Sequence, residues 1–126
     1  MLSGGEFRMG SNRHYPEERP ERTESVAEFA IDVFPVRNSD FAEFVEATKY
    51  VTAAERTGHS HVFQMTQGPV PLNNPDQWWK AVRGACWYNP RPGTELPGNF
   101  SEHPVVHVAL EDAKAYAAWA GGRLPT

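Results

Sequence analysis

Histidine is the residue type in this chain whose spacing first suggests chemistry, because imidazole binds metals and transfers protons near neutral pH. His59 and His61 are two residues apart and could share one face of a strand, but no third ligand is evident nearby. His103 and His107 are four apart, yet Pro104 and the valines that follow it favour an extended chain. Strand geometry would then separate the two imidazoles by about 13 Å, too far for one metal. Loop hydrogen bonding is therefore a better interpretation of these histidines than a metal site.

Cys86 and Ser60 are the side chains that could act as nucleophiles. Cys86 lies in the run Gly-Ala-Cys-Trp with no identifiable base nearby, which favours a buried or half-buried structural thiol. Ser60 directly precedes His61, but adjacency in sequence does not aim a hydroxyl at an imidazole. From these patterns we assign the chain no catalytic residue and no metal ligand.

Large aromatic side chains gather between residues 50 and 102, among many glycines and prolines. A polar linker would not carry them, so we interpret this stretch as an ordered, irregular region packed on the domain. A cleft lined by aromatic rings and a few polar groups would suit an extended peptide or a flat ligand. A loop that covers the core explains the same residues equally well. The set comprises Phe63, Trp78, Trp79 and Trp87, around Glu55 and Ser60.

The first third of the chain shows the hydrophobic spacing of short elements. Alternation predicts a strand over residues 4–10, closed by a turn, and a half-buried strand over residues 29–33. The polar, proline-broken stretch 11–25 is typical of a surface loop. Possible N-caps at residues 38–40, followed by apolar residues on one face, predict a helix that ends near Thr48.

The end of the chain predicts one strand over residues 105–108 and one helix over residues 110–120, with glycine in the left-handed cap position. Thr126 then stands where a residue would cap a further helix. We therefore expect a fold that is incomplete at the C-terminus, with residues 1–126 forming the N-terminal part of a single domain. A sheet that lacks its later strands would expose strand edges, so self-association is expected.

Composition narrows the classes of function. The net charge of −4 is spread without a basic block, which argues against nucleic acid or an anionic membrane surface as a partner. The single cysteine cannot form an internal disulfide, and no apolar stretch approaches the roughly 20 residues that span a bilayer. The first ten residues lack the pattern of a signal peptide, so we expect a cytoplasmic location.

Several motifs, taken together and in this order, resemble the N-terminal half of the formylglycine-generating enzyme family, the sulfatase-modifying factors. They are GGEFRMGS, HYPEERP, FAEFVEATKYVTAAERTGHSHVF, QWWKAVRGACW and the run from HPVVHV to RLPT. The resemblance covers essentially all 126 residues. The GGxFxMG and AGxRLPT pieces also occur in other proteins of this fold, whereas the AER, GHS, QWW and GACW series is more selective for the enzymes.

The resemblance implies an α+β, C-type-lectin-like fold with much irregular backbone. It also implies an oxidase that converts a cysteine of a sulfatase-type CxPxR segment to Cα-formylglycine, with dioxygen and a copper(I) ion held by two cysteine thiolates. Thiolates are the soft ligands that copper(I) prefers, and this chain has only Cys86, which matches neither cysteine of the pair. The family's copper and calcium positions lie downstream of RLPT, so we expect this chain to bind neither ion fully and to be inactive alone.

The resemblance also implies part of a substrate cleft for a sulfatase-type polypeptide. By motif position, Ala54, Ser60 and Trp78 match residues that line the peptide groove, with Glu55 and Trp79 as their neighbours. Trp78 would form an apolar wall and Ser60 a polar contact. The alternative is a noncatalytic module that binds a peptide or small ligand on the same lectin-like scaffold.

Overall fold

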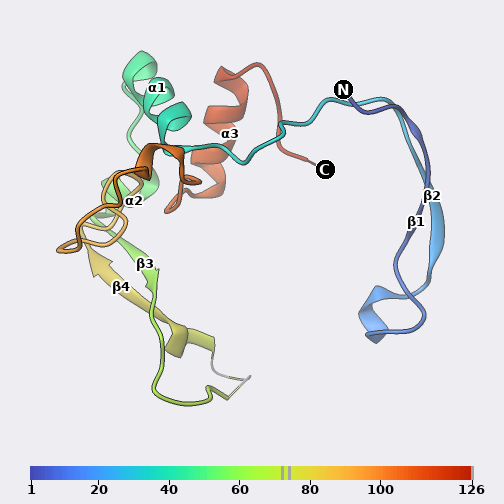
Figure 1. The fold of residues 1–126 in the computed structure, drawn as a ribbon, viewed down its shortest axis with the longest axis horizontal. Coiled ribbons are helices and arrows are strands. Elements are labelled where there is room, and N and C mark those ends of the chain that lie inside the picture. Colours follow the sequence, from blue (N-terminus) through green and yellow to red (C-terminus); the bar gives the residue numbers. More distant parts are fainter. Residues whose placement is uncertain (72, 74, 126) are drawn as a thin grey trace. The chain divides into compact units, whose positions relative to one another are not determined.

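The computed structural model describes residues 1–71, 73 and 75–125, which form short helices and two small antiparallel sheets (Figure 1). They divide into two compact units, Met1–Val33 and Phe34–Thr126, each with its own internal contacts. The mixed α+β class predicted from the sequence is confirmed, while the lectin-like topology stays a prediction. Thr126, the predicted cap of a further helix, lies outside the described residues.

The smaller unit is a β-hairpin. Strand β1 (Gly5–Met9) pairs antiparallel with β2 (Arg22–Val26), and a short 3-10 turn, η1 (Pro16–Glu18), lies in the connection. Gly10 follows β1 with a φ of 83°, and a Cβ atom there would lie 2.4 Å from the Glu18 carbonyl oxygen. Glycine is therefore required at this turn by both backbone conformation and space. The predicted first strand and its closing turn are confirmed.

Two predictions for the smaller unit are wrong. The predicted surface loop 11–25 is interrupted, because β2 begins at Arg22 despite its polar sequence. The predicted strand 29–33 is reduced to one bridge, between Phe29 and Leu2, and Val33 is 87% exposed. The partner strand of β1 is therefore determined by its pairing register with β1 and not by the local alternation of apolar and polar residues.

The larger unit is built around helices α1 (Asn38–Thr48) and α3 (Leu110–Trp119), which lie next to each other in Figure 1. Both helices were predicted from apolar spacing, and both are confirmed. The buried core joins aromatic rings from α1 to one ring from the irregular region and one from α3. These rings are Phe41, Phe44, Trp87 and Tyr116.

The helix ends agree with the sequence in part. The N-cap of α1 is Arg37, one residue before the predicted candidates, and its backbone N–H donates to Asp40 Oδ2 at 3.0 Å. An acidic residue at this position satisfies a free N–H and complements the helix dipole. Past the end of α3, Gly121 has a φ of 75°, which confirms the predicted left-handed cap position.

The region predicted as irregular contains regular elements. Helix α2 (Ala53–Thr57) leads through a left-handed Gly58 into strand β3 (His59–Phe63), which pairs antiparallel with β4 (Trp79–Arg83). Figure 1 shows this hairpin extending away from α2. Two 3-10 turns, η2 (Pro75–Trp78) and η3 (Phe100–Glu102), complete the region.

The strand predicted over residues 105–108 does not form. Val105 donates its N–H to the Val36 carbonyl at 2.9 Å, but His107 takes a φ of 58°, which breaks the extended conformation. The chain is extended at His103, and Pro104 forms an isolated bridge with Arg37, so the extended conformation expected from His103 onward ends at His107. The His107 contacts that accompany this turn belong to the candidate site.

Exposed apolar side chains lead to a first prediction, that this chain self-associates. Each described sheet has two strands, so every strand has one unpaired edge within the described residues. Large apolar side chains such as Ile31 and Val33 are also exposed in the segment that follows β2. Sedimentation velocity should show mass rising with protein concentration. Lysine at both positions should reduce the association, whereas Glu28→Lys should change it less. A monodisperse monomer across the concentration range contradicts the prediction.

Candidate functional site

The β3–β4 hairpin carries three of the residues predicted to line a cleft. Ser60 is the second residue of β3 and lies opposite Val82, whereas Trp79 begins β4 opposite Phe63. Trp78 immediately precedes β4, and its carbonyl accepts from the Gln64 N–H at 2.8 Å. The antiparallel register therefore places Trp78 and Ser60 on one hairpin, although they are 18 residues apart in the sequence.

An apolar pocket of about 490 Å³ lies at the far end of this hairpin. The half-buried Trp78 ring forms part of its wall, opposite side chains from the segment that follows β3. The Trp79 ring packs edge-to-face on Phe63 with centroids 5.6 Å apart, and it is 50% exposed. The lining residues are Phe63, Met65, Thr66, Gly68 and Trp78, so the pocket includes neither Ser60 nor Trp79.

Ser60 is joined to His107 and not to the neighbouring His61. Its Oγ lies 2.9 Å from His107 Nδ1, and His107 Nε2 lies 3.1 Å from the Pro90 carbonyl oxygen. The His61 ring faces His59 instead, with ring centroids 6.3 Å apart, as expected for two residues on one strand face. Sequence analysis missed His107 as a partner of Ser60 because 47 residues separate them.

Ala54 and Glu55 lie on α2, outside the lining of the pocket. Glu55 accepts from the Thr52 backbone N–H at 2.9 Å and from the Thr52 hydroxyl at 2.6 Å, and its own N–H donates to that hydroxyl. This reciprocal capping box fixes the start of α2. Ala54 is 8% exposed and contributes to the core. Both residues therefore stabilise α2, the helix that directly precedes β3 in the chain.

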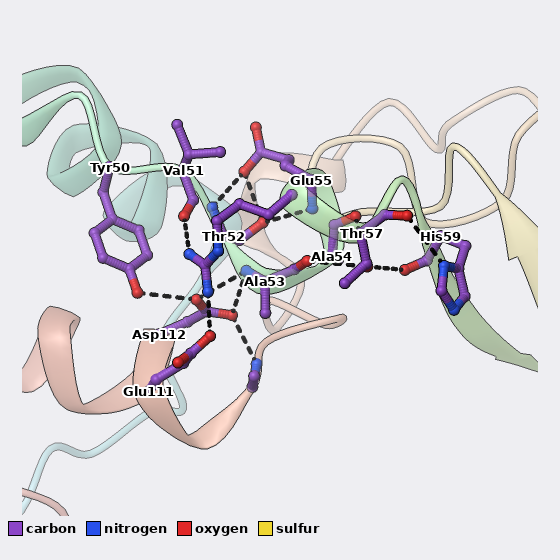
Figure 2. A network of polar contacts seen from close by, with 12 residues as sticks. Tyr50, Val51, Thr52, Ala53, Ala54, Glu55, Thr57, His59, Glu111 and Asp112 are labelled. Atoms are coloured by element: carbon purple, nitrogen blue, oxygen red, sulfur yellow. Dashed lines mark hydrogen bonds and ion pairs between the residues drawn. The ribbon is translucent and has the colours of Figure 1, made fainter.

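Asp112 organises the polar contacts behind α2, as Figure 2 shows, although the sequence analysis did not single it out. Its fully buried carboxylate accepts from the Ala53 N–H at 3.1 Å, the Tyr50 hydroxyl at 3.0 Å and the Ala109 N–H at 2.8 Å. One carboxylate therefore satisfies backbone donors at the starts of both α2 and α3. An Arg56–Glu111 ion pair at the protein surface lies alongside.

The same network changes the pKa of the Tyr50 phenol. Burial, followed by the hydrogen bond to the Asp112 carboxylate, raises the pKa of Tyr50 above its ordinary value. Both causes favour the neutral phenol, which donates its proton to Asp112. The network therefore keeps its donor and acceptor roles fixed at neutral pH.

Cys86 is buried, which confirms the structural thiol predicted from the sequence. Its backbone exchanges hydrogen bonds with Asn89 over a tight turn, with N–O distances of 3.2 and 3.1 Å. A side-chain hydrogen bond with Cys86 is the largest cause that raises the pKa of Tyr88, and burial adds to it. Cys86 is only 4% exposed, which fits a structural thiol.

The metal-binding capacity of this chain can be judged from its donors. Among residues 1–71, 73 and 75–125, no three His, Cys, Asp or Glu side chains form a group that could hold an ion. The copper(I) chemistry implied by the resemblance needs two thiolates, whereas the chain supplies one, which is buried. The residues present therefore do not fit the copper ion. In the same described part of the chain, no helix is long and apolar enough to cross a bilayer.

Comparison with known proteins adds an independent finding. A family model described as the Sulfatase-modifying factor enzyme 1-like domain matches residues 1–126. The chain is 48% identical over 140 aligned positions to a formylglycine-generating enzyme of Mycobacterium tuberculosis, covering 99% of this chain and 47% of that protein. It is also 44% identical over 137 positions to a protein of Bos taurus named inactive C-alpha-formylglycine-generating enzyme 2, covering 100% of this chain and 44% of that protein.

A more distant relative is named for a different activity. Hercynine oxygenase of Mycolicibacterium smegmatis is 30% identical over 131 positions, which cover all of this chain and 28% of that protein. The chain spans about half the length, or less, of the curated relatives it matches. The sequence similarity therefore covers one portion of each of those proteins.

Proposed function

Because this chain belongs to the sulfatase-modifying factor enzyme 1-like family, we propose that it forms part of the peptide-binding cleft of a formylglycine-generating oxidase. The observation that carries the proposal is the 47–48% identity to two enzymes of that name across 99% of this chain. The reaction proposed for the whole oxidase converts a cysteine in a sulfatase-type CxPxR segment to Cα-formylglycine. The C-type-lectin-like topology, calcium binding by the parent and a cytoplasmic location are part of the same proposal.

The proposed contribution of this chain is binding and orientation of the peptide. Trp78 supplies an apolar wall, supported by its place in the lining of the 490 Å³ pocket. Ser60 supplies a polar contact on the adjacent strand, while Ala54 and Glu55 hold α2 and Trp79 packs on Phe63. Since the chain has a single, buried thiol, we assign the copper-binding pair to residues outside it and derive no chemical step from copper here.

A noncatalytic binding module is the second candidate. It is favoured by the 44% identity to a relative whose name states that it is inactive. A reading frame that continues past Thr126 and later encodes two cysteines a few residues apart would favour the oxidase. A stop codon directly after Thr126, with a sharp unfolding transition of the isolated chain, would favour the module.

The proposed cleft predicts that the chain binds a labelled CxPxR peptide more tightly than a scrambled peptide of the same composition. Fluorescence anisotropy should show that Trp78→Ala weakens binding by about tenfold, because an apolar wall is lost. Trp79→Ala is the matched comparison and should cost less than about threefold, since that ring lies outside the pocket lining. Equal losses, or no preference for CxPxR, contradict the cleft.

The same peptide tests the missing chemistry. Incubated with copper(I) and dioxygen, the isolated chain should leave the peptide cysteine unmodified in mass spectra, because a single buried thiol cannot hold the ion between two thiolates. An active homologous oxidase provides the positive control. Aldehyde formation by this chain alone would refute our assignment of the cysteine pair.

A further inference from the structure

Ser60, His107 and Pro90 link three chain segments near the start of β3, whereas the apolar pocket lies beyond the end of that strand. Ser60 lies on β3, Pro90 follows the tight turn at Cys86, and His107 lies just before α3. The His107 imidazole contacts both others, through Nδ1 to Ser60 Oγ at 2.9 Å and through Nε2 to the Pro90 carbonyl at 3.1 Å. Both imidazole nitrogens are thus engaged, and the ring cannot rotate without losing a hydrogen bond.

The partners of the imidazole decide the direction of each hydrogen bond. A carbonyl oxygen can only accept, so the Nε2 atom that faces Pro90 must carry a proton. In the neutral imidazole the other nitrogen then has no proton and accepts. The Ser60 hydroxyl must therefore donate its single proton to Nδ1. Its remaining capacity is that of an acceptor, with lone pairs on Oγ.

The backbone of His107 shows that this arrangement depends on tertiary context. Its φ of 58° lies in the left-handed region, which non-glycine residues seldom adopt, although histidine does so more often than most. The preceding valine segment is tied to Val36 by a backbone hydrogen bond, and Ala109 is tied to Asp112. Fixed points on both sides therefore hold the imidazole toward Ser60.

We propose that His107 is a positioning residue that keeps the Ser60 hydroxyl as a hydrogen-bond acceptor for a backbone N–H group of the bound peptide. This inference rests on the proposed function, since it presupposes that a peptide occupies the cleft. Ser60 is paired with Val82 of β4, so its backbone is already used in the sheet. Its side chain is therefore the part of Ser60 that can bind a ligand. A peptide N–H is a donor present at every non-proline position, which suits an acceptor on the same hairpin as the apolar wall.

The proposed positions of the protons on the His107 imidazole and the Ser60 hydroxyl can be tested without any peptide. Long-range 1H–15N NMR spectra of the chain at about pH 8, where an ordinary imidazole is neutral, should show His107 as the Nε2–H tautomer. Ser60→Ala should shift the Nδ1 resonance, because its hydrogen-bond donor is lost. An Nδ1–H tautomer, or an Nδ1 resonance indifferent to Ser60→Ala, overturns the inference whether or not the chain binds peptide.

The role in recognition is tested with CxPxR peptides in which one backbone N–H at a time is replaced by N–CH3. One position should weaken binding to the wild-type chain by about fivefold, the worth of one hydrogen bond. That discrimination should vanish in Ser60→Ala and in His107→Gly, where glycine keeps the positive φ without strain. His107→Asn should preserve most of it, since asparagine tolerates positive φ and offers an amide oxygen near the place of Nδ1.

A double-mutant cycle separates positioning from a general structural effect. If His107 acts through Ser60, His107→Gly should weaken binding of the unmethylated peptide when introduced into the wild-type chain but should weaken it no further when introduced into Ser60→Ala. Additive losses, or discrimination intact in His107→Gly, overturn the inference even when the parent peptide binds. Failure of the parent peptide to bind, with the Nε2–H tautomer present, overturns the proposed cleft and the recognition role together.

Discussion

Replacing Asp112 with alanine should destabilise the larger unit by about 3–4 kcal/mol. The substitution removes the acceptor of three donors, the Tyr50 hydroxyl and the backbone N–H groups of Ala53 and Ala109. Each buried donor left without a partner costs about 1–3 kcal/mol, and relaxation recovers part of the sum. The predicted loss is large because one carboxylate caps two helices that are distant in sequence.

Asp40 provides a matched control for Asp112. Both aspartates occupy the third position of a helix and accept from the backbone N–H of the N-cap residue. Asp40 has that one local contact and is only half-buried, so Asp40→Ala should cost about 1 kcal/mol. Tyr50→Phe should also cost about 1 kcal/mol, since it removes a single hydrogen bond.

Urea unfolding followed by circular dichroism measures these differences, provided that the slope of each transition is unchanged. The Asp112→Asn variant keeps the side-chain volume and one acceptor oxygen, so its loss should lie between those of Asp40→Ala and Asp112→Ala. An Asp112→Ala chain no less stable than the Asp40→Ala chain would show that the buried carboxylate does not join α2 to α3.

Truncation of Phe41 is the second substitution with a large expected effect. Its side chain is 1% exposed, and its ring contacts those of Phe44, Trp87 and Tyr116 at centroid distances of 5.3, 5.4 and 5.8 Å. Phe41→Ala should cost about 3–5 kcal/mol, from lost burial and from the cavity that remains. That loss is a large fraction of the stability of a small unit.

Phe34 is the matched control, because it lies in the same unit but is 61% exposed, with the Arg37 guanidinium 4.8 Å from its ring. Phe34→Ala should cost no more than about 1 kcal/mol. Phe41→Leu, which refills part of the cavity, should fall between the two and remains measurable if the alanine variant is unfolded. Thermal unfolding monitored at a helical wavelength distinguishes the three. Similar transitions for Phe41→Leu and Phe34→Ala would contradict a core centred on Phe41.

The helix and turn predictions, which depended on local spacing, agree with the structure, whereas the strands predicted over residues 29–33 and 105–108 do not form. The apolar residues of α1 and α3 recur every three or four positions, and the left-handed glycine follows α3 as expected. Cys86 is buried, as expected for a cysteine with no identifiable base nearby in the sequence. In each case the signal lies within a few residues, which is the range over which a helix or a turn is specified.

Predictions that required a distant partner were wrong or absent. The β1–β2 pairing recruits a polar segment, and the β3–β4 hairpin crosses a region whose glycines and prolines indicated irregular backbone. Neither register could be read from one strand alone, because an antiparallel ladder is chosen jointly by two segments. The same limit applies to the site, where Ser60 was compared with its neighbour His61 and not with His107.

By itself, the sequence determined the α+β class, two helices, the buried thiol and the motifs that resemble the family. Helical period and motif order are properties of contiguous residues, so they can be recognised without knowledge of the folded chain. Only the tertiary structure decided that Asp112 joins α2 to α3 and that His107 turns toward Ser60. Those contacts join residues that are 59 and 47 positions apart in the sequence. They form only after the packing of the core has brought the segments together.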